Sequence, residues 1–425
     1  MAGHIPQGRT SAGGPDKVTI YASLVFALSF GLLISDYMAR QVLNAVFPLL
    51  KAEWSLTDSQ LGLLSGVVAI MVGLLTFPLS LAADRWGRVR SLTLMAILWS
   101  LATLLCAAAQ SYETMLIGRA LVGIGEAAYG SVGIAVVISV FPSRLRATLA
   151  AAFMAGGLFG QVLGVGIGGA VAASFGWRSA FAVIGIAGLV LGLLYPIVVR
   201  ERRIRALAGL AADADGKPAT APLRELVGNR SVRLAYLASG LQLFAAGALP
   251  AWLPSYFNRY YDLPVDRAGS LSAVLLLVCG TGMILCGMLS DRVSKDRPEA
   301  KMSLSIAYTL GAAVCLAIAM QLPPGTAQLV MLGAAMFLVA GTVGPVGAMV
   351  ANLTPLAIHG SAFATLTLAN NLLGLAPGPI LTGRLADGIG LENAFSLLPV
   401  PCLLAALTFA AMRRSYLSDL QATSS

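Results

Sequence analysis

The sequence is dominated by long apolar segments, and this feature limits the possible folds more than any other. Breaks at proline, glycine and charge clusters separate twelve segments. Each is long enough to cross a bilayer as a helix, which needs about 20 apolar residues. The segments are continuously apolar rather than alternating, which argues against a β-barrel. The predicted transmembrane helices lie near residues 18–47, 58–82, 91–110, 113–140, 146–174, 177–199, 231–260, 267–290, 300–322, 326–353, 358–387 and 390–412.

Composition excludes a water-soluble protein. Of the 425 residues, 57% are hydrophobic and 11% are charged, whereas soluble proteins carry about 25% charged residues. A soluble enzyme, a nucleic-acid-binding domain and a disulfide scaffold are therefore excluded. The chain contains no G-x-x-x-x-G-K-[ST] loop and only two histidines, so neither an ATP-driven pump nor a zinc protease is expected. The five cysteines lie in predicted spans at no metal-ligand spacing, so no metal or cofactor is expected.

Lysine and arginine are distributed very unevenly between the two sides of the predicted bundle. If both termini are cytoplasmic, 21 of these residues lie on the cytoplasmic side and 5 on the outer side, with Arg40 and Arg119 inside spans. Cytoplasmic loops carry an excess of positive residues, so this orientation is predicted. The abundance of arginine and alanine suggests a bacterial source. We therefore expect an integral protein of the bacterial cytoplasmic (inner) membrane.

The sequence repeats one plan in two halves. Gly62 precedes Asp84 by 22 positions, and Gly269 precedes Asp291 by the same 22 positions. Internal duplication of this kind is typical of secondary transporters, whose solute site lies at the repeat interface near the middle of the membrane. The predicted organisation is a disordered cytoplasmic tail (1–17), an N-terminal six-helix half (18–199), a cytoplasmic linker loop (200–230), a C-terminal six-helix half (231–412) and a cytoplasmic tail (413–425).

Several motifs resemble those of the major facilitator superfamily. Residues 80–92, SLAADRWGRVRSL, resemble the loop motif between helices 2 and 3 of that family, and residues 287–297 are a degenerate copy. The segment RALVGIGE at 119–126 is similar to a family pattern in helix 4. Within the superfamily, Arg40-Gln41 and GEAAY at 125–129 most resemble the spinster-like branch. The resemblance implies a transporter that works by alternating access. One chain of twelve helices already contains both halves needed for a central cavity, so we expect function as a monomer.

The loop motif has a physical interpretation. Asp84 would end the second helix at the cytoplasmic surface, where its carboxylate can cap the positive N-terminal end of the helix that begins near Gly360. By resemblance, this contact latches the halves in the outward-facing state. The alternative is a tight turn with topology-setting charges only. The predicted latch residues are Asp84, Arg85, Gly87, Arg88, Asp291 and Arg292.

Four ionisable residues fall inside predicted spans, where charge is costly and usually functional. Asp36 and Arg40 are four residues apart and Arg119 and Glu126 are seven apart, so each pair shares one helix face, which we expect to line the cavity. Glu126 is the predicted proton site, because a carboxyl group that loses its arginine partner during the cycle takes up a proton. Asp36 is the second candidate. Spinster-like proteins commonly carry Asp directly before the arginine, where Ala39 stands here. The alternative is a structural ion pair.

Neutral polar side chains complete the predicted site. Amide groups in an apolar helix need partners, which are either another helix or a solute. The predicted substrate-binding residues are Arg40, Asn44, Arg119, Tyr129, Gln161, Gln242, Asn370 and Asn371.

These residues favour one function over its alternatives. The two arginines suit a carboxylate or phosphate group, so the favoured function is proton-coupled transport of a small, anionic organic solute. Expected partners are that solute, protons and membrane lipids, without nucleic acid. One alternative is a lysophospholipid-like solute, as the spinster resemblance implies. A drug/proton antiporter is disfavoured, because Val165 follows Gly164 where such exporters carry proline.

Overall fold

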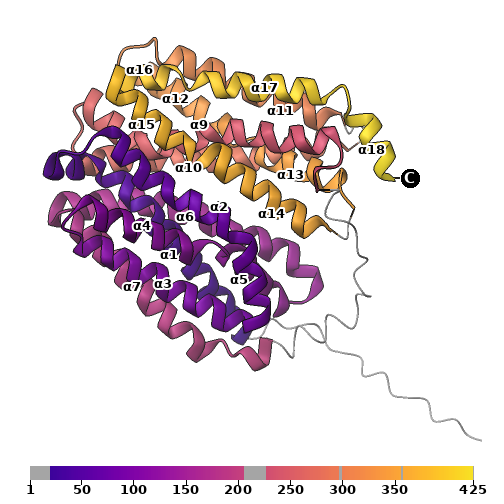
Figure 1. Cartoon of the computed structure of the whole chain (residues 1–425), viewed down its shortest axis with the longest axis horizontal. Helices are drawn as coiled ribbons and strands as arrows, with labels where there is room; N and C mark the ends of the chain where they lie inside the picture. The colour runs from indigo at the N-terminus through magenta and orange to yellow at the C-terminus, as the bar shows by residue number, and fades with distance from the viewer. Residues whose placement is uncertain (1–19, 205–225, 296–298, 356–357, 425) are drawn as a thin grey trace, which may run out of the picture.

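The computed structural model describes residues 20–204, 226–295, 299–355 and 358–424. Every regular element in these ranges is helical. Figure 1 shows two bundles that lie side by side, one built from the indigo-to-magenta helices and one from the pink-to-yellow helices. The predicted tail 1–17 and linker residues 205–225 lie outside the described residues. The two-half architecture follows the duplication in the sequence.

The N-terminal half follows the predicted order of spans. Helices α4 and α5 together form one crossing. The bounds are α1 (Ile20–Trp54), α2 (Asp58–Trp86), α3 (Arg88–Ala108), α4 (Tyr112–Glu126), α5 (Tyr129–Ser139), α6 (Ser143–Phe175) and α7 (Trp177–Val198).

The C-terminal half repeats this plan with more breaks. In the described part of the chain, eleven segments are long and apolar enough to span a membrane, and α14, η3 and α15 together supply the remaining crossing, the eleventh along the chain. This confirms the predicted all-α architecture. The bounds are α9 (Arg230–Tyr260), α10 (Val265–Val293), α11 (Ala300–Ala319), α12 (Thr326–Val339), α13 (Val343–Asn352), α14 (His359–Asn370), η3 (Asn371–Leu375), α15 (Pro377–Ile389), α16 (Leu391–Ser396), α17 (Pro399–Met412) and α18 (Tyr416–Ser424).

The eleventh crossing along the chain is interrupted by the π-helical turn η3. The backbone N–H of Ala376 donates to the carbonyl of Asn371, five residues earlier, at 2.9 Å. Pro377 and Pro379 follow, and neither has an N–H with which to continue the α-helical pattern. The backbone therefore widens where Asn370 and Asn371 interrupt the apolar segment.

The first helix is longer than the sequence predicts. We expected it to end before Pro48, but α1 continues to Trp54 with the proline inside it. A proline removes one backbone hydrogen bond from a helix. The final turn is held instead by Glu53, whose carboxylate accepts hydrogen bonds from Trp177 Nε1 at 2.6 Å and Arg178 Nη1 at 2.7 Å. These contacts fix the end of α1 to the start of α7.

The two halves meet closely where α2 crosses α15 and where α6 crosses α10. A Cβ atom on Gly62 would overlap the carbonyl oxygen of Pro379, and one on Gly269 would lie 3.0 Å from that of Val165. Both approaches are closer than a normal van der Waals contact. The two glycines that the sequence repeat pairs therefore occupy equivalent positions at the two crossings between the halves.

Gly62→Ala is expected to weaken the α2–α15 crossing, because the new methyl group meets backbone that cannot rotate away. We expect a loss of about 1–3 kcal/mol of stability, measured as a lower thermal unfolding midpoint in detergent. Gly388→Ala is the matched control, because nothing lies within 4 Å of a Cβ at that position of α15. Equal midpoints for the two variants would contradict the close crossing.

Candidate substrate cavity and proton site

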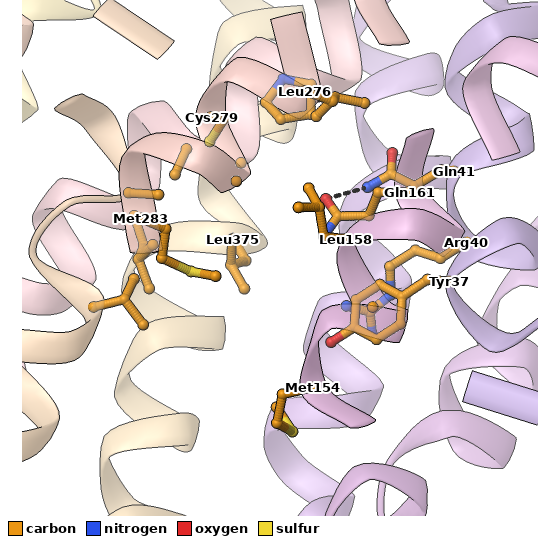
Figure 2. Close-up of a pocket in the computed structure, with 18 of the residues that line it drawn as sticks. Tyr37, Arg40, Gln41, Met154, Leu158, Gln161, Leu276, Cys279, Met283 and Leu375 are labelled. Atoms are coloured by element: carbon orange, nitrogen blue, oxygen red, sulfur yellow. Dashed lines mark hydrogen bonds between the residues drawn. The ribbon is translucent and has the colours of Figure 1, made fainter. Parts of the chain in front are cut away.

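A cavity of about 560 Å³ lies between the two halves. This volume is within the range of small-molecule sites, about 300–1,000 Å³. Figure 2 shows its two walls facing each other. One wall carries Tyr37, Arg40, Gln41, Met154, Leu158 and Gln161, and the other carries Leu276, Cys279, Met283 and Leu375.

The walls differ in polarity. Most of the polar lining groups belong to α1, α2 and α6 of the N-terminal half, with Arg40 as the charged one among them. The C-terminal half contributes mainly aliphatic and sulfur-containing side chains, including Leu243, Leu276, Met283 and Ile284. Methionine adapts its shape to different apolar surfaces. The cavity therefore offers hydrogen bonds on one side and apolar contact on the other.

Three charged side chains meet beside the polar wall. Arg40 Nε donates to Glu126 Oε2 at 3.0 Å. The carboxyl group of Asp36, one turn earlier on α1, lies close to that of Glu126 and interacts with it electrostatically. Asp36 and Glu126 are 6% and 5% exposed, while the Arg40 side chain is 22% exposed and lines the cavity. The structure thus brings together three of the four buried charges predicted from the sequence.

A break in the fourth crossing positions Glu126. This residue ends α4, and α5 begins at Tyr129 after a short interruption. The interruption leaves the carbonyl of Ala127 without a helical partner, and the hydroxyl group of Thr76 on α2 donates to it at 2.7 Å. Glu126 therefore lies at a fixed break between two helical segments, against α1.

Arg119 occupies a different environment from the one expected. Its guanidinium group is fully buried and donates to the carbonyl oxygens of Ala39 at 2.8 Å, Arg40 at 2.9 Å and Leu64 at 3.3 Å. It is not among the residues that line the cavity. Backbone carbonyls of α1 and α2 hold its donors, so Arg119 ties α4 to these two helices rather than facing a solute.

Four neutral side chains form a hydrogen-bonded chain along the polar wall. Ser65 Oγ donates to Asn44 Oδ1 at 3.1 Å, and Asn44 Nδ2 donates to Gln41 Oε1 at 2.6 Å. Gln41 Nε2 then donates to Gln161 Oε1 at 3.3 Å, as the dashed line in Figure 2 shows. All four residues line the cavity. We call this set the amide chain.

The structure separates the residues predicted to bind substrate into two groups. Arg40, Asn44 and Gln161 line the cavity; Arg119, Tyr129, Gln242, Asn370 and Asn371 do not. The side chain of Tyr129 donates to the carbonyl of Ser29, that of Gln242 to Val339 and that of Asn371 to Thr367. A polar group in an apolar helix that reaches a backbone acceptor contributes to packing instead of facing a solute.

Three polar lining residues of the N-terminal half were not predicted. Tyr37 and Gln41 lie three residues before and one residue after Arg40, on the α1 face that also carries Asn44. Helical spacing from Arg40 and Asn44 was the signal that could have identified them. Ser65, on α2, gave no such signal because serine is common in membrane helices.

The predicted latch residues lie at the end of the bundle where α2 meets α3. Gly87 has a φ of 102°, which favours glycine, and it ends α2 and begins α3. The Glu201 carboxylate accepts from the backbone N–H groups of Arg88 and Val89 and thereby caps α3. These contacts stay within one half.

The other latch residues lie apart from this cap. Asp291 is 3.8 Å from Lys301, while Arg85 and Arg292 are exposed. The side chain of Asp84 lies outside the described residues.

At the opposite end, polar contacts join the two halves. Arg259 of α9 donates to both carboxylate oxygens of Asp58 at 2.6 and 2.8 Å, and Lys51 binds the same carboxylate. Asp387 of α15 accepts from the backbone N–H groups of Asp58 at 2.7 Å and Ser59 at 2.9 Å. The Asp387 carboxylate, which belongs to the C-terminal half, therefore caps the N-terminus of α2 in the N-terminal half. We call Lys51, Asp58, Arg259 and Asp387 the Asp58 cluster.

An aromatic contact lies between the Asp58 cluster and the cavity. Phe47 of α1 packs against Trp252 of α9 with 5.2 Å between ring centroids, and Trp252 Nε1 donates to the carbonyl of Pro379 at 3.1 Å. Both rings are fully buried. Asn44 and Pro250, about one turn away along the same helices, line the cavity. The cavity is therefore closed at the Asp58 end.

Arg119→Lys is expected to destabilise the N-terminal half although it keeps the charge. An ammonium group lacks the planar fork that reaches three carbonyl oxygens on two helices, so polar groups are left unpaired in an apolar interior. We expect a loss of about 3 kcal/mol, measured as a lower unfolding midpoint in detergent. Arg413→Lys, at an exposed position, should change the midpoint little. A small effect at Arg119 would contradict the clamping role.

Comparison with known proteins places these features in a family. A model of the Major Facilitator Superfamily matches residues 29–376. The hexuronate transporter of Bacillus subtilis is 25% identical over 380 residues, covering 86% of this chain and 88% of the relative. The sphingosine-1-phosphate transporter SPNS2 of Danio rerio is 28% identical over 314 residues, covering 68% of this chain and 61% of the relative.

A solved structure has the same fold. It is the crystal structure of a bacterial homologue of the human lysosomal transporter Spinster, in an inward-facing and unoccupied conformation. The TM-score is 0.80 at 21% sequence identity, with 95% of this chain and 99% of the other covered. These relatives confirm the predicted resemblance to the spinster-like branch.

Proposed function

The chain belongs to the Major Facilitator Superfamily, and from this premise we propose that it couples protons to the transport of a small organic anion. The observation that carries the proposal is the pair of buried carboxyl groups, Asp36 and Glu126, held against Arg40 at the cavity wall. Neither carboxyl group lines the cavity itself, and Arg40 lies between them and it. Acidic residues in the interior of a membrane helix bundle mark proton and ion pathways.

The geometry of the carboxyl pair favours binding of one proton. Asp36 Oδ1 and Glu126 Oε1 have no hydrogen-bond donor among the described residues. An ionised carboxylate only accepts hydrogen bonds, so two neighbouring carboxylates satisfy each other only when one carries a proton. Two buried carboxylates in contact also repel each other, and a shared proton removes that repulsion. Arg40 stabilises the remaining negative charge.

Charge balance supports an anionic substrate. Two arginines and two acidic residues lie in this region, and their formal charges cancel when both acids are ionised. Binding one proton leaves the region with one excess positive charge. An anion that enters the cavity near Arg40 then restores neutrality, so proton and anion favour each other's binding. The hexuronate transporter among the relatives is named for an acidic sugar.

The two ends of the bundle support alternating access. The Asp58 cluster and the Phe47–Trp252 contact close one end. The positive-inside rule makes the Gly87 end cytoplasmic in a bacterial inner membrane, so we assign this closed-outside arrangement to the inward-facing state of a monomer. In the outward-facing state, Asp84 would cap the N-terminal end of α14 and latch the cytoplasmic end.

One observation favours a second substrate class. The apolar wall that includes Leu276, Met283 and Ile284 faces the polar wall across the cavity. A lysophospholipid-like molecule would place its head group near Arg40 and its chain on the apolar wall. SPNS2 is named as a sphingosine-1-phosphate transporter. Competition between lysophospholipids and small acids for the purified protein would separate the two classes.

Glu126→Gln is expected to abolish proton-driven accumulation while solute exchange is partly retained, because the amide keeps the shape but binds no exchangeable proton. The measurement uses proteoliposomes with an internal pH-sensitive dye and a panel of organic acids, sugars, drugs and lysophospholipids. Glu113→Gln, at an exposed position on the same helix, is the control. Unchanged uphill transport in Glu126→Gln would remove Glu126 from the coupling role.

Arg259→Gln is expected to open the Asp58 end, because Arg259 supplies the ion pair to Asp58 from the other half. Spin labels at Ala52 and Asn393, both exposed at this end, would report the distance by pulsed electron paramagnetic resonance. We expect a longer-distance population to appear. The control is Arg267→Gln, an exposed cation that also lies near this end. Identical distance distributions for both variants would rule out the Asp58 cluster as the closing contact.

A further inference from the structure

The amide chain has a direction. Ser65 begins it by donating through its hydroxyl group to Asn44. Asn44 and Gln41 each accept through the amide oxygen and donate the next hydrogen bond through the amide nitrogen, and Gln161 accepts the last one. Hydrogen bonds aligned in this way polarise one another. The donor end of the chain is therefore Gln161 Nε2.

Gln161 Nε2 is available to a ligand. Its carbonyl oxygen accepts from Gln41, but in the described part of the chain no acceptor lies on its nitrogen. Gln161 lines the cavity, and Figure 2 shows its side chain between the ribbon of its own helix and the open space. An amide nitrogen carries two hydrogen-bond donors. The polar wall thus presents to the cavity donors whose partner is not supplied by the protein.

Arg40, on the same polar wall as Gln161, is a second hydrogen-bond donor. Arg40 is a donor-only side chain whose Nε is engaged by Glu126, and its guanidinium group lies over the Tyr37 ring, 5.6 Å from the ring centroid. Arg40 and Gln161 therefore both present N–H groups on the same wall. The opposite wall, with Leu276, Cys279 and Met283, offers apolar contact.

We propose that Gln161 is a specificity-determining residue that donates to a carboxylate oxygen of the substrate, whose apolar body rests against the α10 wall. The inference rests on the proposed function and defines its substrate class as organic acids with an apolar ring or chain. Ser65, Asn44 and Gln41 are positioning residues, because they hold the Gln161 amide with its nitrogen toward the ligand. A substrate that offers a donor at this point would meet another donor and be rejected.

The test compares three probes that share one apolar body: phenylacetate, phenylacetamide and phenethylamine. Binding to the purified protein is measured by isothermal titration calorimetry without a proton gradient. The wild type should bind phenylacetate best and phenethylamine worst. Gln161→Glu replaces the donors with an acceptor and should weaken phenylacetate binding by about tenfold or more, while phenethylamine binding is unchanged or improved.

Further variants separate recognition from structure. Gln161→Leu should weaken phenylacetate binding by about tenfold and leave phenethylamine binding within about twofold. Ser65→Ala, at the far end of the chain, should produce a smaller loss through weaker polarisation of Gln161. Gln321→Glu makes the same chemical change at an exposed site outside the cavity and should alter nothing. Unfolding midpoints identify any variant that fails to fold.

Each outcome decides the proposal. It is overturned if the wild type fails to bind phenylacetate, if the wild type binds the three probes equally, or if the Gln161 variants weaken all three probes by the same factor. A preference for phenethylamine would mean that the amide chain runs in the reverse direction. Selective phenylacetate binding without proton movement in proteoliposomes would refute proton coupling but leave the role of Gln161 intact.

Discussion

The arrangement of the polar wall depends on the buried guanidinium group of Arg119. A guanidinium group stays charged in proteins, so an apolar interior must supply acceptors for it. Arg119 finds three carbonyl oxygens, and two of them belong to Ala39 and Arg40 on the stretch of α1 that lines the cavity. This clamp fixes α1 against α4, and thus fixes the side chain of Arg40 against Glu126. The proposed proton site therefore rests on a charge that does not face the cavity.

The sequence predicts those features that local physical signals determine. The length of the apolar segments predicts the twelve crossings, and the cost of a charge in a membrane identifies Arg40 and Glu126. The end of α1 depends on a tertiary contact, which the local sequence does not reveal. Glu53 binds Trp177 of α7 and so holds the last turn of α1 beyond Pro48. Gln161 and Gln242 show the same limit. They look alike in an apolar helix, but Gln242 reaches the carbonyl of Val339 whereas Gln161 faces the cavity. That difference depends on how far each side chain lies from a backbone carbonyl of a neighbouring helix. The local sequence pattern does not reveal this distance.

The duplicated halves share a fold but divide the chemistry between them. The polar and charged groups of the site belong to α1, α2, α4 and α6, while α10 supplies an apolar wall. Apolar contacts have no fixed direction, so the C-terminal half can shift along a bound solute at little cost in hydrogen bonding. The interruption at η3 lies on this adaptable side, and Leu375 of η3 lines the cavity. The N-terminal half would keep its hydrogen bonds to the solute while the other half moves.

Alternating access requires that the two ends of the bundle are never open at the same time, and helices α2 and α15 provide a physical basis for this. They pack antiparallel, and Asp387 at the end of α15 caps the start of α2. The proposed latch reverses the roles at the other end, with Asp84 at the end of α2 capping the start of α14. Each cap contributes about 0.5–2 kcal/mol, so the two closed states are similar in energy as far as the caps are concerned. In the proposed mechanism, rocking of the halves would exchange one cap for the other, and the free energy of proton and solute binding would decide which end opens.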